Sequence, residues 1–102
     1  MHITLEQALT IARAAETALE PLGYHVGLTG GCLYRGGSDK DIDLIVYPHD
    51  PQAVKPDDWE ESVEAALATI GLVDRFTTDL NYVNRVVWIM GWNGIRVDLF
   101  MS

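Results

Sequence analysis

"GGCLYRGGSDKDIDLIV", residues 30–46, is the stretch that decides the fold, because it joins four glycines and three aspartates to an apolar end. Its last three residues are continuously apolar, which is typical of a central strand. Asp41 and Asp43 lie at the start of this strand. Residues i and i+2 of a strand project from one face, about 6.5–7 Å apart. The two carboxylates are therefore predicted to lie side by side, with Ile42 turned into the core on the other face.

The elements around this strand predict an α/β (α+β) fold in which helices pack on a mixed β-sheet. Thr4 can cap a helix, which Pro21 and Gly23 then end. Asn93-Gly94 is a strong hairpin signal and predicts a C-terminal β-hairpin. The other expected elements are a strand over 24–29, a helical turn over 32–35, the strand over 41–47, a helix over 57–70, a strand over 72–77, and hairpin strands over 85–92 and 95–101.

Length and composition predict a single folded domain over residues 1–102. Hydrophobic residues make up 48% of the chain and charged residues 22%, the balance of a folded protein. No apolar run approaches the roughly 20 residues of a membrane helix, and the N-terminal residues lack the basic region of a signal peptide. The lone cysteine, Cys32, excludes an internal disulfide and fits a reducing compartment. We therefore expect a cytoplasmic protein without a membrane partner.

The net charge of −8 bears on the choice of ligand. Nucleic-acid binding depends on Lys and Arg that neutralise phosphates, so strong binding of nucleic acid by this domain is not expected. A site that meets phosphates through metal ions stays open, because bound cations invert the local charge.

Three aspartates are the candidate metal ligands. Two carboxylates as close as Asp41 and Asp43 repel each other unless a cation lies between them. Mg²⁺ or Mn²⁺ would suit them, since hard cations prefer oxygen ligands. A third acid, Asp98, lies in the apolar strand "IRVDLFM", where a carboxylate is costly without a cation or a hydrogen-bond partner. If the two strands are neighbours, the three acids can hold a pair of metals about 3.5–4 Å apart.

The glycines predict an anion site beside these acids. Gly30 and Gly31 follow a strand and precede a helical turn, so bare backbone N–H groups can face a phosphate. Ser38 adds a hydroxyl donor.

Together these features resemble the signature of the polymerase-β-type nucleotidyltransferase superfamily. That signature is an apolar strand, Gly-Gly or Gly-Ser, a spacer, Asp-x-Asp among apolar residues, and a third acid on a later strand, which Asp98 matches. The resemblance covers residues 24–101 and the preceding helix. It implies metal-dependent nucleotidyl transfer from a nucleoside triphosphate to an acceptor hydroxyl. Gly30 and Gly31 would hold the triphosphate, Asp41 and Asp43 both metals, and Asp98 the catalytic metal while it helps to activate the hydroxyl.

This sequence departs from the family at two places. Gly31 stands where serine is frequent, and only four residues follow Asp98, where larger members append helices that hold the base and the acceptor. We therefore expect the acceptor site to come from a second copy of the chain or a helical partner, with Tyr82, Trp88 and Trp92 in the contact. On the alternation of the hairpin strand alone, Trp88 and Trp92 are predicted to be core residues or a cover over a helix, with a partner surface as the alternative. The alternative to turnover is a domain that binds nucleotides or partners without it.

Three other sequence features give weaker evidence of a functional site. "DKDID" resembles the start of a calcium loop, but Leu44 occupies the sixth position, which needs glycine. His2, His25 and His49 are scattered without the spacing of a zinc site. Cys32 is predicted to be a small buried residue.

Overall fold

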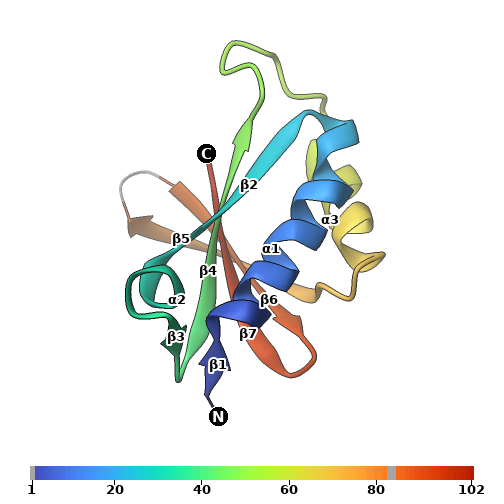
Figure 1. The fold of residues 1–102 in the computed structure, drawn as a ribbon. Coiled ribbons are helices and arrows are strands. Elements are labelled where there is room, and N and C mark those ends of the chain that lie inside the picture. Colours follow the sequence, from blue (N-terminus) through green and yellow to red (C-terminus); the bar gives the residue numbers. More distant parts are fainter. Residues whose placement is uncertain (1, 83–84) are drawn as a thin grey trace.

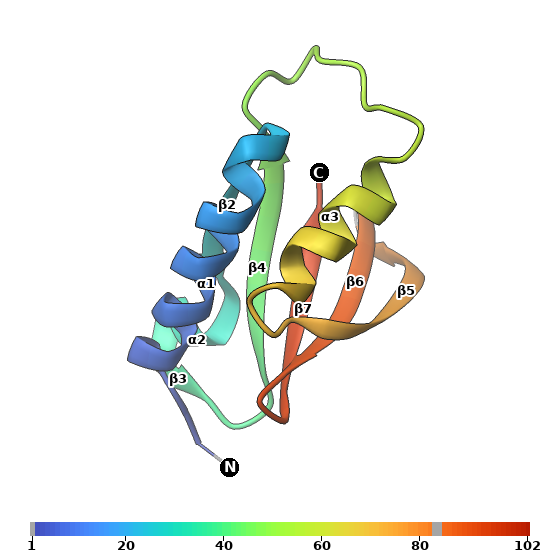
Figure 2. The same ribbon diagram turned by 90° about the vertical axis from the view of Figure 1, so that its right-hand side faces the viewer.

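The computed structural model describes residues 2–82 and 85–102, which form a five-stranded mixed sheet with the two longer helices on one face (Figure 1). Figure 2 shows two of the helices in front of the sheet, one toward each end of the strand order, and in Figure 1 the same two helices lie to the right of the sheet. The sheet strands are β2 (Tyr24–Thr29), β4 (Asp41–Pro48), β5 (Val73–Tyr82), β6 (Arg85–Trp92) and β7 (Ile95–Met101). The helices are α1 (Leu5–Leu19), α2 (Gly30–Arg35) and α3 (Trp59–Ala68), and a 3₁₀ turn spans Glu20–Leu22.

The strand order is β2-β4-β7-β6-β5, which puts β4 and β7 next to each other at the centre. These two strands run parallel, whereas every other neighbouring pair is antiparallel. The β6–β7 pair is the predicted C-terminal hairpin, closed by Asn93 and Gly94, both at positive φ. The predicted mixed sheet with packed helices is therefore confirmed.

Helix α1 begins at the predicted cap. The Thr4 hydroxyl accepts a hydrogen bond from the Gln7 amide at 3.1 Å, and the Gln7 side chain accepts one from the Thr4 amide at 2.9 Å. This reciprocal pair satisfies two amides that a helix leaves free at its start. The chain leaves the helical region at Gly23, with φ +91°. The residues that α1 buries are Ala8, Ile11, Ala12, Ala15 and Leu19.

Replacing Thr4 by Ala is expected to lower the free energy of unfolding by about 1 kcal/mol, the usual cost of a lost N-cap. Urea denaturation would measure it. Thr10→Ala is the matched control, because the Thr10 hydroxyl donates only to the Glu6 carbonyl within the same helix. That control should be neutral or slightly stabilising, since alanine favours helix more than threonine. Equal losses in both variants would contradict the capping role.

The hydrophobic core lies between the sheet and the two long helices. Trp88 of β6 is fully buried there and stacks on Trp59 of α3, with ring centroids 5.8 Å apart. The guanidinium of Arg75 covers Trp88 at 4.4 Å and is paired with Glu60 and Glu64 of α3.

The core interpretation of Trp88 is confirmed, and its prediction as an exposed partner contact is wrong, because α3 covers this face of the hairpin. Trp92 is half-buried against the same core. The side chain of Tyr82, the third residue of the predicted contact, lies outside the described residues.

Several boundaries differ from the sequence prediction. Helix α2 begins at Gly30, two residues early, and β5 continues five residues past Thr77. A two-residue pairing of β1 (Ile3–Thr4) with β3 (Gly37–Ser38) was not predicted. This pairing ties the glycine-rich segment to the N-terminus of the chain.

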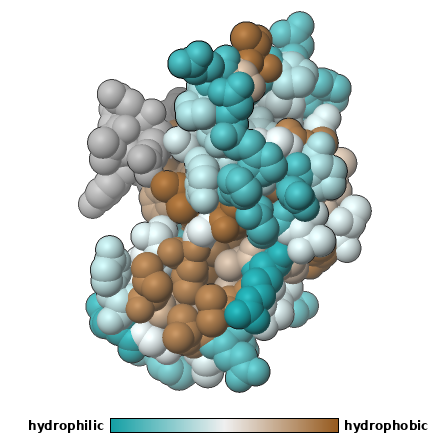
Figure 3. Space-filling model, turned by 45° about the horizontal axis from the view of Figure 1, so that its top comes forward, coloured by the Kyte–Doolittle hydropathy of each residue, from teal (hydrophilic) through white to brown (hydrophobic). Residues whose placement is uncertain are grey.

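Figure 3 shows one face of the molecule, on which an apolar patch is bordered by polar residues. An open hollow of about 480 Å³ between α1 and β2 is lined mainly by apolar side chains, among them Leu9, Ala12, Val26 and Leu28. Within the described part of the chain, no helix has the length and apolar character needed to cross a membrane.

Candidate metal centre

The three predicted acids lie on the face of the sheet opposite α1 and α3. Along β4, Ile42 and Leu44 are fully buried in the core, whereas Asp41 and Asp43 alternate with them and are half-buried. Asp98 of β7 is the direct cross-strand partner of Asp43. Parallel pairing of the two central strands thus gathers acids that are more than fifty residues apart in the sequence.

Carboxylate oxygens of the three aspartates lie within 4.8 Å of one another. Among the described residues this is the one group of three or more Asp, Glu, His or Cys side chains close enough to hold a metal ion. The donors are all carboxylate oxygens, which suits a hard divalent cation such as Mg²⁺. Asp98 is the most enclosed, with 7% of its surface exposed.

Mutual repulsion marks this cluster. Burial, followed by the charges of Asp41 and Asp98, raises the pKa of Asp43 from 3.8 to about 6. Burial and the charge of Asp98 also raise the pKa of Asp41, although Arg96 opposes the shift. Raised carboxyl pKa values mean that the folded protein disfavours the ionised acids. A bound cation would reverse that preference.

The raised pKa of Asp43 predicts a pH-dependent stability. The folded protein holds a proton on Asp43 up to about pH 6, whereas the unfolded chain releases it near 3.8. The folded state therefore binds more protons between these values, and the contribution of Asp43 to stability is lost as the pH rises through about 6.

Thermal melts of the metal-free wild type and Asp43→Asn, between about pH 5 and pH 8, would measure this effect as a difference. The stability of the wild type relative to Asp43→Asn should rise as the pH falls through about 6. A difference that does not change with pH would contradict the raised pKa.

Gly30 brings the start of α2 against the acid cluster. Its φ is +72°, and a Cβ at this position would collide with the carboxylate of Asp43. Thr29, at the N-cap position, makes no side-chain capping bond to the helix. The first residue of α2 therefore lies against Asp43, and the helix lacks a side-chain cap.

Gly31 also makes room for a side chain. A Cβ at Gly31 would collide with the guanidinium of Arg35, which folds back over the glycine turn. Arg35 follows the two glycines in the same short helix, α2. The structure thus brings a cation to the predicted anion site.

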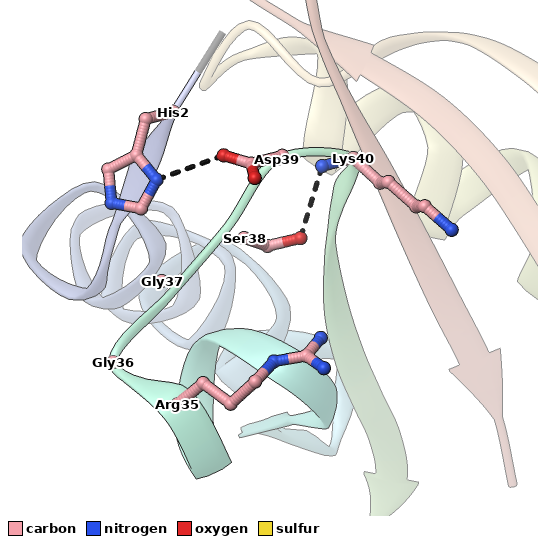
Figure 4. Close-up of a pocket in the computed structure, with 7 residues that line it drawn as sticks. All are labelled: His2, Arg35, Gly36, Gly37, Ser38, Asp39 and Lys40. Atoms are coloured by element: carbon pink, nitrogen blue, oxygen red, sulfur yellow. Dashed lines mark hydrogen bonds and ion pairs between the residues drawn. The ribbon is translucent and has the colours of Figure 1, made fainter.

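Ser38 lies in a pocket of about 510 Å³ beside this turn (Figure 4). Its hydroxyl oxygen accepts hydrogen bonds from the amides of Lys40 at 3.2 Å and Asp41 at 3.4 Å, so it shapes the entry into β4. In Figure 4, the guanidinium of Arg35 points toward β4, whereas the ammonium of Lys40 points away from the other labelled side chains. The complete lining is His2, Arg35, Gly36, Gly37, Ser38, Asp39 and Lys40.

Arg96 is paired with Asp98, although it was not among the predicted site residues. Its Nε donates to Asp98 Oδ1 at 2.8 Å and its Nη2 to Asp98 Oδ2 at 3.1 Å, while Asp41 Oδ2 lies 3.9 Å from Nε. The sequence contained the signal, because residues i and i+2 of a strand share a face. Arg96 is the cation that the acid in this apolar strand required.

The structure also places the remaining candidates. Cys32 is buried as predicted, with its Sγ 3.7 Å from the Asp41 carbonyl. The histidines are less scattered in space than in sequence, because the His25 and His49 rings lie 3.8 Å apart. His25 is paired with Glu16 at 2.7 Å, and His49 with the Tyr24 carbonyl at 3.0 Å.

Comparisons with known proteins add no relative to this description. A scan against models of known protein families finds no match, and a search of curated proteins finds none either.

Proposed function

We propose that this domain is a polymerase-β-type nucleotidyltransferase that moves a nucleotidyl group from a nucleoside triphosphate to an acceptor hydroxyl. The observation that carries the proposal is the convergence of Asp41, Asp43 and Asp98 beside Gly30. Carboxylates alone hold many kinds of cation. A glycine turn with uncapped amides next to them adds a place for phosphate, and the combination favours phosphoryl-type chemistry.

In the proposed reaction, the acceptor oxygen attacks the α-phosphorus in line, and the bond to the pyrophosphate oxygen breaks. Bound Mg²⁺ or Mn²⁺ would neutralise charge on the phosphate oxygens. Asp41 and Asp43 would hold both ions, and Asp98 would hold one and help to take up the hydroxyl proton. Pyrophosphate leaves with the electron pair of the broken bond.

The polyphosphate end of the substrate is assigned to the glycine turn. The amides of Gly30 and Gly31 would donate to the phosphate; the close approach of Gly30 to Asp43 and the lack of a side-chain cap on α2 support this assignment. The guanidinium of Arg35 lies over Gly31 and can bind phosphate oxygens in pairs. Ser38 remains a candidate donor, because its described bonds use the hydroxyl oxygen as an acceptor and leave its proton free to donate.

The test is incubation of the protein with each labelled nucleoside triphosphate, Mg²⁺ or Mn²⁺, and a panel of hydroxyl-bearing acceptors. We expect metal-dependent transfer of label and release of pyrophosphate from at least one combination. The Asp39→Asn variant should retain this transfer, since Asp39 is an exposed acid of the same segment that pairs with His2 instead of the cluster. No transfer over a broad panel, including the protein itself and a second copy as acceptors, would count against the proposal.

A second candidate function is nucleotide or partner binding without turnover. The ion pair between Arg96 and Asp98 favours it, because a cation already occupies the cluster. Calorimetry with a triphosphate and Mg²⁺ separates the candidates: binding without transfer supports this one. Absence of any nucleotide binding would remove both.

A further inference from the structure

Arg96 donates hydrogen bonds to both carboxylate oxygens of Asp98, the most buried acid of the cluster. Its Nε and Nη2 lie 2.8 Å and 3.1 Å from the two oxygens of Asp98. Asp41, its cross-strand partner, lies 3.9 Å away through Oδ2. One guanidinium thus spans two of the three carboxylates that would ligate a metal.

The guanidinium and a divalent cation compete for Asp98. Both Asp98 oxygens accept charge-assisted hydrogen bonds from Arg96, which use two of the roughly four lone-pair sites of the carboxylate. A metal ion on the remaining sites would place two cations on one carboxylate, and these repel each other. Metal binding therefore weakens the pairing of Arg96 with Asp98.

Arg96 is the partner that is able to move. Its side chain is 51% exposed, whereas that of Asp98 is 10% exposed. An arginine with half its surface in water can turn outward with little cost, because water replaces its hydrogen bonds. Asp98 is fixed by a strand paired on both sides.

We propose that Arg96 is a built-in counter-cation that competes with divalent metal for Asp98 and turns away when the metal binds. The inference rests on the proposed metal site and adds to it a residue that sets metal affinity. In the metal-free protein the guanidinium offsets the repulsion of the acids. At low metal concentration the guanidinium stays bonded to Asp98.

Isothermal titration with Mn²⁺ alone tests the competition in the wild type, Arg96→Met and Arg13→Met. Arg13 is exposed on α1, which packs on the opposite face of the sheet, so its loss changes the net charge equally without touching the cluster. Arg96→Met is expected to bind Mn²⁺ about three- to tenfold more tightly than the wild type, allowing for the exposure of the ion pair. Arg13→Met should remain close to the wild type.

Arg96→Lys provides a second readout, because lysine keeps the charge but cannot bond to both oxygens of a carboxylate in the fork geometry of arginine. It should bind Mn²⁺ with intermediate affinity. Equal or weaker binding by Arg96→Met than by Arg13→Met would overturn the inference alone. Absence of Mn²⁺ binding in every protein would overturn the metal site with it. Nucleotidyl transfer plays no part in this readout, so failure of the transfer assay is a separate result.

Discussion

Asp43→Asn is expected to leave the metal-free fold as stable as the wild type or more stable, and to remove most of its stabilisation by divalent metal. Asparagine keeps the shape of the side chain but removes one of three repelling charges. Burial, followed by the charges of Asp41 and Asp98, raises the pKa of Asp43. Because the folded state disfavours the ionised form of Asp43, removal of this charge should not lower the free energy of unfolding.

The larger expected effect of Asp43→Asn is on the stabilisation of the fold by divalent metal. A ligand that binds only the folded state stabilises it by roughly 2.7 kcal/mol at a hundredfold excess over its Kd. The wild type should show this gain in Mg²⁺ or Mn²⁺, and Asp43→Asn should lose most of it because one ligand oxygen is no longer charged. Thermal melts of both proteins, in metal and in chelator, would measure the four values.

Asp39→Asn is again the control, since it removes an exposed acid from the same segment and should retain the metal response. A purely structural Asp43 predicts the opposite pattern. The metal-free variant would then lose about 1–3 kcal/mol through a broken buried hydrogen bond, and metal would change neither protein.

Gly30→Ala is expected to be much more damaging than Gly36→Ala, although both glycines have nearly the same φ, +72° and +75°. Each variant places an L side chain in the left-handed region, at a cost of roughly 1–2 kcal/mol. At Gly36 a new Cβ meets no atom within 4 Å, so this strain is the whole effect. At Gly30 the Cβ collides with the Asp43 carboxylate.

The collision has two measurable consequences. Urea denaturation should show a larger loss of stability for Gly30→Ala than for Gly36→Ala. Titration with Mn²⁺ should show a loss of metal affinity only in Gly30→Ala, because Asp43 must leave its position. Equal behaviour of the two variants in both assays would contradict the close approach of the glycine turn to the acids.

The sequence predicted the parts of the site that depend on local order. The alternation of Asp41, Ile42 and Asp43 fixed which side chains share a face, since a strand has a period of two. The hairpin at Asn93-Gly94 likewise follows from local turn chemistry. The convergence of Asp98 with these acids depended on β4 and β7 being neighbours, and the sequence supported this only as a condition.

Contacts between distant segments account for what was missed. Trp88 lies on the face of β6 that α3 covers, and the hairpin sequence alone does not specify which helix packs there. The pairing of β1 with β3 involves two residues on each strand, too few for a periodic pattern. The approach of Gly30 to Asp43 is also a tertiary contact. The sequence indicates it only through the glycine itself, because a residue with a Cβ would not fit there.

The most direct test of the central claim is a crystal soaked with Mn²⁺ and a non-hydrolysable nucleoside triphosphate, examined by anomalous diffraction. We expect an anomalous peak bounded by carboxylate oxygens of Asp41, Asp43 and Asp98, with Arg96 turned away from Asp98 and phosphate oxygens against the amides of Gly30 and Gly31. A map at millimolar Mn²⁺ with no peak at the three aspartates, and with Arg96 still bonded to Asp98, would contradict it.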